Sequence, residues 1–188
     1  MRELFRCGGY KMITGIPTLI STATPSNTDI VDITSGIDST YNTYLFVFTD
    51  IYLHQDRDKL TFQTGASYNT ATTTAPMSAL NLESGGTGVL EYAGGIAFSN
   101  MTTMVELSRG QSNAADACIA GILYLYNPSS TSFLKQFAWN FSQNEGAAAS
   151  SLQLIGSGSI NSTSAITQVR FEAQANNMTG TIQMYGIT

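Results

Sequence analysis

His54, Asp56 and Asp58 lie close together in the stretch "YLHQDRDK", which makes it the first place to look for chemistry. His54 is the only histidine, so a multi-histidine metal site is excluded. His54 could still serve as the base of a Ser-His-Asp or Cys-His arrangement. Such an arrangement normally comes with a recognisable sequence motif around its nucleophile. Because no G-x-S-x-G elbow or comparable signature occurs, we predict that His54 is an exposed loop histidine.

Two aspartates spaced two apart can also suggest a calcium site. Calcium needs six to eight oxygen ligands, and the EF-hand spacing is absent. A second acidic group, made of Asp29, Asp32 and Asp38, could contribute ligands across space. We favour a solvated loop, held by an ion pair of Arg57 or Lys59, over a calcium site.

Glu91, Glu106 and Glu172 lie in strand-like segments and are candidates for the two carboxylates of a glycosidase. With thirteen acidic residues in the chain, some pair always looks suggestive, and no convergence can be derived from the spacing. We therefore predict a protein that is not an enzyme and has no catalytic residue, metal or cofactor.

Aromatic residues alternate along "TSFLKQFAWNF", with Phe133, Phe137, Trp139 and Phe141 on one face and Lys135 between them. Such a row could stack against sugar rings. Alternating aromatic residues in a strand are more often core residues. We favour the core.

The composition excludes several classes of function. The 188-residue chain fits one domain, and only 11% of its residues are charged, against about 25% in a typical soluble domain. Its net charge is -5 and its eight Lys and Arg residues are scattered, so a nucleic-acid binder is not expected.

No apolar stretch approaches the ~20 residues of a membrane helix, so membrane insertion is not expected. Cys7 and Cys118 are expected to be free thiols.

Residues 29–188 have a β pattern throughout. Strand-like runs, rich in aromatic and β-branched residues, are "TYLFVFTDIYL", "LTFQT", "GVLEYAG", "TTMVELS", "CIAGILYLY", "TSFLKQFAWNF", "SLQLIG" and the closing "ITQVRFEAQANNMTGTIQMYGI". No convincing amphipathic helix interrupts them. Eight or nine short strands joined by Gly, Ser and Asn loops predict an all-β fold, a β-sandwich with the jelly roll as the favoured form. The last strand is expected to lie inside a sheet.

Residues 1–28 differ from the rest, because glycines and Pro17 break up their apolar residues and no period survives. We predict an irregular, extended N-terminal arm. It packs either on its own domain or across a neighbouring subunit, and the second alternative makes it a docking arm. The candidate docking residues are Leu4, Phe5, Tyr10, Met12, Ile13, Ile16 and Leu19.

Three segments, "DITSGIDSTYNTYLFVFTDIYLH", "GILYLYNPSSTSFLKQF" and the closing "ITQVRFEAQANNMTGTIQMYGI", resemble virion-associated proteins of tailed bacteriophages, especially marine ones. In that family a "TSGIDSTY" segment opens the domain, "L-x-N-P-S-S-T" marks a turn in its middle, and the chain ends on "SGTIxLYGI". The resemblance covers residue 30 to the end. This chain differs in its N-terminal arm and between "LTFQTG" and "GVLEY", where it looks shortened.

The resemblance implies a structural protein of the virion, assembled in the host cytoplasm, and brings no catalytic residues. We expect a head decoration or cement protein whose partners are other virion proteins. The alternative is a tail fibre or appendage protein that binds a glycan of the host surface. A homo-oligomer is expected, with a trimer as its form by analogy with other viral jelly rolls.

Overall fold

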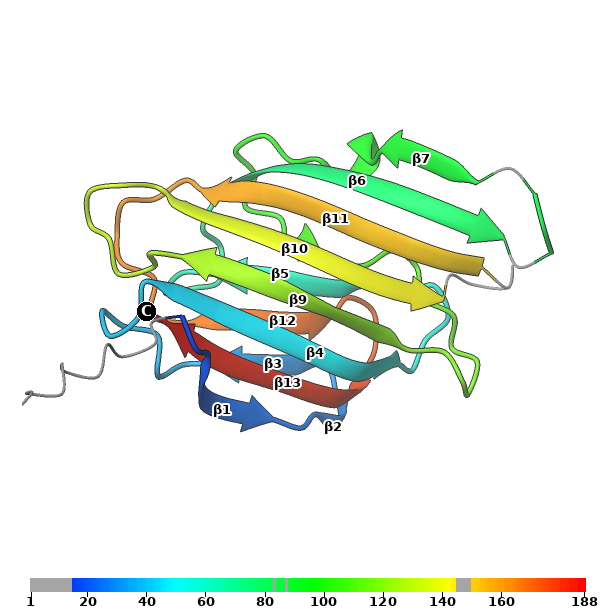
Figure 1. The fold of residues 1–188 in the computed structure, drawn as a ribbon, viewed down its shortest axis with the longest axis horizontal. Coiled ribbons are helices and arrows are strands. Elements are labelled where there is room, and N and C mark those ends of the chain that lie inside the picture. Colours follow the sequence, from blue (N-terminus) through cyan, green and yellow to red (C-terminus); the bar gives the residue numbers. More distant parts are fainter. Residues whose placement is uncertain (1–14, 83, 87, 145–149) are drawn as a thin grey trace, which may run out of the picture.

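The computed structural model describes residues 15–82, 84–86, 88–144 and 150–188. Two antiparallel sheets pack face to face as a β-sandwich, with the larger sheet in front in Figure 1 and the smaller one behind it. The predicted all-β sandwich is therefore confirmed. Within the described ranges there is no α-helix, and one short 3-10 helix, η1, spans Gly94–Ile96.

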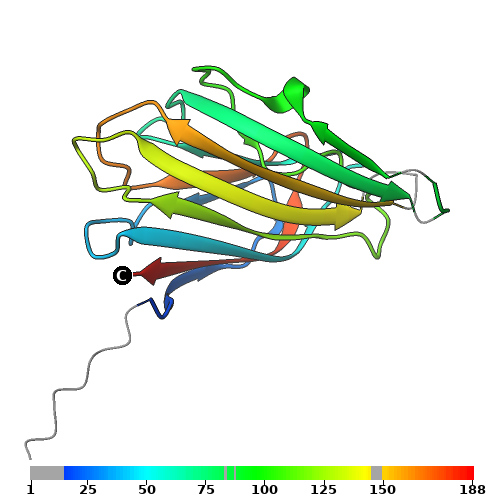
Figure 2. The same ribbon diagram turned by 45° about the horizontal axis from the view of Figure 1, so that its top comes forward.

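The large sheet runs in the order β1 (Thr18–Ala23), β13 (Met178–Ile187), β4 (Thr43–Leu53), β9 (Ile119–Tyr126), β10 (Lys135–Asn144), β11 (Ser150–Ile160), β6 (Thr72–Leu82) and β7 (Val89–Tyr92), with β2 (Ser26–Thr28) also beside β13. The small sheet runs in the order β3 (Ile30–Ile33), β12 (Val169–Ala173), β5 (Leu60–Thr64) and β8 (Val105–Glu106). As expected, β13 lies inside its sheet, between β1 and β4. Figure 2 shows the small sheet covering only part of the large one.

Aromatic side chains from both sheets form the centre of the core. The ring of Phe171 in β12 lies 5.3 Å from that of Phe46 and 4.9 Å from that of Phe48, both in β4. It also lies 5.8 Å from the ring of Phe62 in β5. Alternate residues of β4 and β12 are buried, which is the period expected where one face of a strand packs on a core.

The strands β1 and β2 correct the prediction that residues 1–28 form an irregular arm. Both strands pair with β13, so the part of the segment from Thr18 onward belongs to the sandwich. The ladder shifts register between Leu19 and Ser21, and this bulge breaks the alternation that would have marked a strand in the sequence. Residues 1–14 lie outside the described residues.

A long strand, β6, lies in the stretch that looked shortened and had been given no strand. It contains Pro76, which cannot donate a backbone hydrogen bond and usually excludes a central strand. Here the proline lies where the neighbouring strand ends, because β7 pairs only with Met77 to Leu80 of β6. The Ala93 amide then donates to the Pro76 carbonyl oxygen at 3.1 Å.

A bulge also bends β4 against β13. The register shifts between Thr179 and Thr181 in the ladder of β13 with β4, and between Phe48 and Ile51 in the ladder of β4 with β9. Asp50 at this bulge has a φ of 51°, and Gly180 has a φ of 146°. A Cβ added at Gly180 would lie 2.7 Å from the Asp50 carbonyl oxygen. The glycine is therefore required both by its backbone conformation and by the close approach of β4.

Candidate functional site

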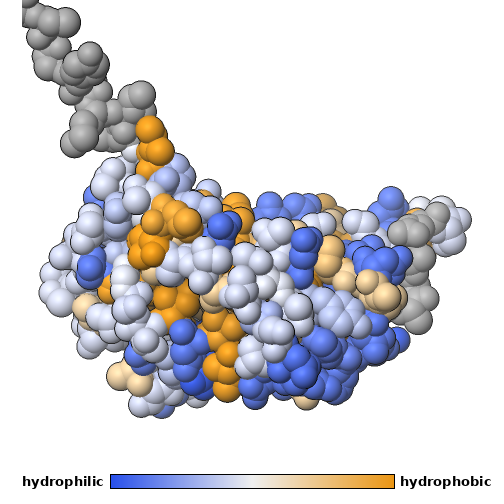
Figure 3. Space-filling view, turned by 90° about the horizontal axis from the view of Figure 1, so that it is seen from below, coloured by the Kyte–Doolittle hydropathy of each residue, from blue (hydrophilic) through white to orange (hydrophobic). Residues whose placement is uncertain are grey.

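Two of the predicted docking residues lie in the described part of the chain, at the β1 edge of the large sheet. Ile16 is 61% exposed and Leu19 is 51% exposed, although both are large and apolar. The other five, Leu4, Phe5, Tyr10, Met12 and Ile13, lie outside the described residues. Figure 3 views this edge and shows apolar residues gathered near the start of the described chain, whereas hydrophilic residues dominate the opposite, lower right part of the surface.

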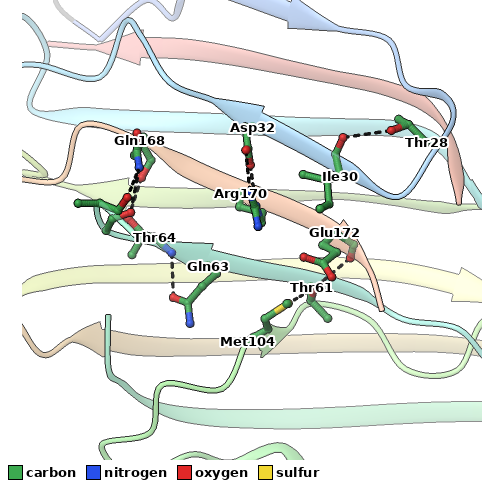
Figure 4. Close-up of polar contacts among 12 residues, drawn as sticks. Thr28, Ile30, Asp32, Thr61, Gln63, Thr64, Met104, Gln168, Arg170 and Glu172 are labelled. Carbon is green, nitrogen blue, oxygen red and sulfur yellow. Dashed lines mark hydrogen bonds and ion pairs between the residues drawn. The ribbon is translucent and has the colours of Figure 1, made fainter. Parts of the chain in front are cut away.

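The outward side of the small sheet carries a group of polar and charged side chains, which we call the polar face. It consists of Asp32 from β3, Arg170 and Glu172 from β12, Thr61 from β5, Glu106 from β8, and Lys59. The inward residues of β12 are Val169, Phe171 and Ala173, so strand alternation turns Arg170 and Glu172 outward. Figure 4 shows Asp32 beside Arg170, and Glu172 beside Thr61, across the strands.

Asp32 and Arg170 form the best-defined contact of the polar face. They are direct cross-strand neighbours in the ladder between β3 and β12. The guanidinium donates from Nε to Oδ1 and from Nη2 to Oδ2, both at 2.7 Å, which is a bidentate pair. The hydrogen bond that Arg170 donates to Asp32 raises the pKa of Arg170 above its ordinary value.

Tyr68, from the loop after β5, completes this group. The Cζ atom of Arg170 lies 4.1 Å from the centre of the Tyr68 ring, within the range of a cation–π contact. Partial burial, followed by the nearby charge of Asp32, raises the pKa of the Tyr68 hydroxyl. An aromatic ring, a fixed cation and a fixed carboxylate thus lie together at the surface.

Glu172, Thr61 and Glu106 form a second row on the polar face. Thr61 pairs with Glu172 on one side and with Glu106 on the other. Two strand spacings therefore separate the carboxylate-bearing Cα atoms, or ~10 Å. Of the three glutamates considered for a glycosidase, the fold brings two onto one face, and Glu91 lies on β7 of the other sheet.

The environments of the two glutamates differ. The Nζ atom of Lys59 donates to Oε1 of Glu106 at 2.6 Å, and Oε2 of Glu106 is buried without a hydrogen-bond partner in the described chain. Burial raises the pKa of Glu172, and the charge of Arg170 opposes the shift. The negative charge of Glu106 is thus balanced by Lys59, whereas Glu172 is affected mainly by burial.

Asp58 corrects the prediction of a solvated acidic loop, because it is only 2% exposed. Its Oδ1 atom accepts from the amides of Lys59 at 2.7 Å and Ala175 at 2.9 Å, and its Oδ2 atom accepts from the amide of Asn176 at 3.1 Å. The carboxylate ties the loop before β5 to the turn between β12 and β13. Across the described ranges, no group of three or more His, Cys, Asp or Glu residues is placed to hold a metal.

Of the two ion pairs predicted for this loop, the structure has the one made by Arg57, which lies 4.0 Å from Asp56 in an exposed pair. Lys59 pairs with Glu106 instead of an aspartate of its own loop. His54 is half-buried instead of exposed. Its Nε2 lies 2.9 Å from Oγ1 of Thr179, and its ring packs edge-on against Tyr52 at 5.0 Å.

The aromatic row in β10 is part of the core, as favoured, with one exception. Phe137, Trp139 and Phe141 are buried, whereas Phe133 is 71% exposed because the strand begins only at Lys135. Lys135 points inward with the aromatic residues and is 1% exposed. Its Nζ donates to the carbonyl oxygens of Ser162 and Ser164, and burial lowers its pKa.

The remaining sequence expectations concern thiols and membranes. Cys118 is a half-buried free thiol, and Cys7 lies outside the described residues. The described segments include no helix with the length and apolar character needed to cross a membrane.

The residues that sequence reasoning missed are Tyr68 and the pairing of Asp32 with Arg170. Asp32 and Arg170 lie 138 positions apart in the sequence, and only the pairing of β3 with β12 brings them together. No protein-family model matches the chain, and neither a curated protein nor a solved structure matches it significantly.

Proposed function

We propose that this protein is a non-enzymatic structural protein of a bacteriophage virion, a head decoration or cement protein displayed on the particle. The observation that carries the proposal is the exposure of Ile16 and Leu19 at the β1 edge, where the predicted docking segment joins the sandwich. Burying a side chain of this size in a partner contributes about 1.5–3 kcal/mol. Many copies on one particle make such modest contacts effective.

The order of the strands supports the jelly-roll form of the sandwich as part of this proposal. Setting aside β2, β6, β7, β10 and β11 leaves eight strands. Numbered in chain order, they run 1-8-3-6 in the large sheet and 2-7-4-5 in the small one. Two interlocked Greek keys give this arrangement, which is found in viral capsid and lectin domains. The partners are other virion proteins, and the protein forms a homo-oligomer, a trimer by analogy with viral jelly rolls.

The test compares two N-terminal deletions for binding to purified particles that lack the protein. Deletion of residues 1–17 removes six of the seven docking candidates and leaves β1 intact. We expect lost binding to particles with an unchanged melting temperature. Deletion of residues 1–28 also removes β1 and β2, so we expect it to lower the melting temperature as well, because Ile20 and Ala23 pack against the core.

Single substitutions of exposed apolar residues provide a finer test with a matched control. Ile16→Ser, at the proposed docking edge, is expected to weaken binding to particles. Phe133→Ser, in the loop before β10, removes a similarly exposed side chain and is expected to bind normally. Particle binding that is unchanged by the 1–17 deletion would refute docking through this segment.

The polar face favours a second candidate function, a tail fibre or appendage protein that binds a host glycan. A sugar offers hydroxyl groups to a carboxylate and a guanidinium, and an apolar ring face to an aromatic side chain. Asp32, Arg170 and Tyr68 provide these three groups together, and the ion-paired side chains remain 31% and 25% exposed.

This candidate is tested by binding of the purified protein to host cells and to a glycan array. Tyr68→Ala and Arg170→Lys should both reduce glycan binding, since lysine cannot reproduce a bidentate, stacked guanidinium. Gln174→Ala, at an exposed position beyond the end of β12, is the control. Glycan binding that survives both substitutions would exclude the polar face as the receptor site.

A further inference from the structure

The middle of the outward side of the large sheet is a broad surface without charge, which we call the uncharged face. Asp50, exposed at the bulge of β4, lies outside the two rows that define it. Antiparallel register places two rows of side chains across it. One row consists of Tyr185, Leu45, Tyr124, Ala138, Ser157 and Ala75, and the adjacent row of Gln183, Val47, Ile122, Asn140, Ile155, Met77 and Tyr92. None of these side chains is ionisable near neutral pH. All point away from the small sheet, because the residues between them are buried.

Charge is divided unequally between the two outward sides of the sandwich. The polar face on the small sheet carries Asp32, Lys59, Glu106, Arg170 and Glu172. The uncharged face spans more strands and carries no such residue in either row. Interface cores are depleted in charged residues and enriched in aromatic residues and Met, which is the composition of these rows.

Large apolar side chains are exposed on the uncharged face. Met77 is 42% exposed, Ile155 is 39% exposed and Tyr92 is 61% exposed, and the three are direct neighbours across β11, β6 and β7. Leu90, also outward on β7, is 72% exposed. On β9, between β4 and β10, Tyr124 and Tyr126 stack with ring centres 6.0 Å apart.

The size of the face matches what an oligomer requires. Two further uncharged rows flank these two, one running from Thr43 through Tyr126 to Thr73 and the other from Ser142 through Gln153 to Leu90. The four rows together extend over about seven residues along the strands, or ~24 Å at ~3.4 Å per residue, and seven strands at ~4.8 Å spacing span ~29 Å. The product is ~700 Å², which falls within the ~600–1,000 Å² that each partner buries in a stable interface.

We propose that the uncharged face is the surface through which copies of this chain associate with one another. A face without charges can pack on another copy of the chain without like-charge repulsion, although the whole chain has a net charge of -5. A different partner protein would be expected to leave a pattern of complementary charge on the surface that it recognises, and neither row has one. This inference holds whether or not the protein belongs to a virion.

Sedimentation velocity and light scattering on the purified full-length chain test the proposal. We expect the wild type to have a mass that is a multiple of 20.1 kDa. Ile155→Lys and Met77→Lys place a charge at positions already partly exposed to solvent, so both variants should fold, with a melting temperature as the check. Each should lower the mass to that of a single chain.

Phe133→Lys is the matched control, because it also replaces an exposed apolar residue by lysine but lies in the loop before β10. It should keep the wild-type mass. A wild type that is monomeric at micromolar concentration would overturn the proposal, and so would an oligomer that persists in both face variants. A variant of the uncharged face that keeps the wild-type mass but loses binding to particles would also overturn the proposal. That result would assign the face to contact with another virion protein.

Discussion

Phe171 joins the two sheets, because its ring contacts phenylalanines of both. Its side chain is fully buried, with Phe46 and Phe48 of the large sheet on one side and Phe62 beside it. We expect Phe171→Ala to lower the free energy of unfolding by about 3–5 kcal/mol, through lost transfer energy and the cavity left behind. Denaturant unfolding measures the change.

The exposed Phe133 provides the comparison for this prediction. Its side chain is 71% exposed, so Phe133→Ala should change the free energy of unfolding by no more than ~0.5 kcal/mol. Equal effects of the two substitutions would contradict the core that the ring contacts define.

Glu172 gives the polar face a pH dependence. Burial raises its pKa in the folded state above the ordinary value of 4.5, so the folded protein holds the proton more tightly than the unfolded chain. The stability that this provides is complete below the unfolded pKa and is lost as the pH rises through the folded pKa. Glu172→Gln should therefore have a higher melting temperature than wild type at pH ~7, and the difference should shrink below pH ~4.

Removing one negative charge also changes the net charge of the protein, and this effect must be separated. Asp116→Asn removes the same charge from an exposed loop position. If both variants raise the melting temperature equally at every pH, the effect belongs to net charge and the prediction for Glu172 is wrong.

At the scale of single residues, the sequence predicted the core better than the surface. Phe137, Trp139 and Phe141 were assigned from their alternation, because a strand that buries one face repeats every second residue. The contacts of Asp58 and of Arg170 could not be assigned, since their partners come from strands or turns more than a hundred positions away.

Gly180 belongs to the scale of elements, because it allows the bulge between β13 and β4. Its φ of 146° and the nearby Asp50 carbonyl oxygen exclude a side chain without local adjustment. Gly180→Ala should lower the free energy of unfolding by on the order of 1–3 kcal/mol, measured by denaturant unfolding. Gly95→Ala, where an added Cβ meets nothing within 4 Å, should cost less.

Strands were predictable where alternation was regular and were missed where it was interrupted. The regular strands β4, β9, β12 and β13 were all expected from their aromatic and β-branched residues. The strand β1 was hidden by its bulge, and β6 by Pro76 and by a composition rich in Thr, Ala and Ser. In both cases, pairing with a strand distant in the sequence stabilises a β conformation for which the local residues have only a weak propensity.

At the scale of the whole molecule, the proposed association through the uncharged face should be insensitive to salt. Salt weakens contacts between exposed charges and leaves the burial of apolar and uncharged surface largely intact. We expect the sedimenting mass to stay the same between ~0.05 and ~0.5 M sodium chloride. Dissociation in high salt would instead indicate an interface made by charges such as those of the polar face.

The position of β13 between β1 and β4 also determines the order in which the sandwich can form. In the ladder with β1, Thr18 pairs with Gly186, so the first strand of the large sheet has no neighbour until nearly the last one has been synthesised. During translation the edge of β4 that β13 will cover therefore remains open, with unpaired amides and carbonyl groups that favour pairing with other chains. Contacts of such long sequence separation also make folding slow, so nascent chains of this protein should depend on chaperones until β13 is inserted.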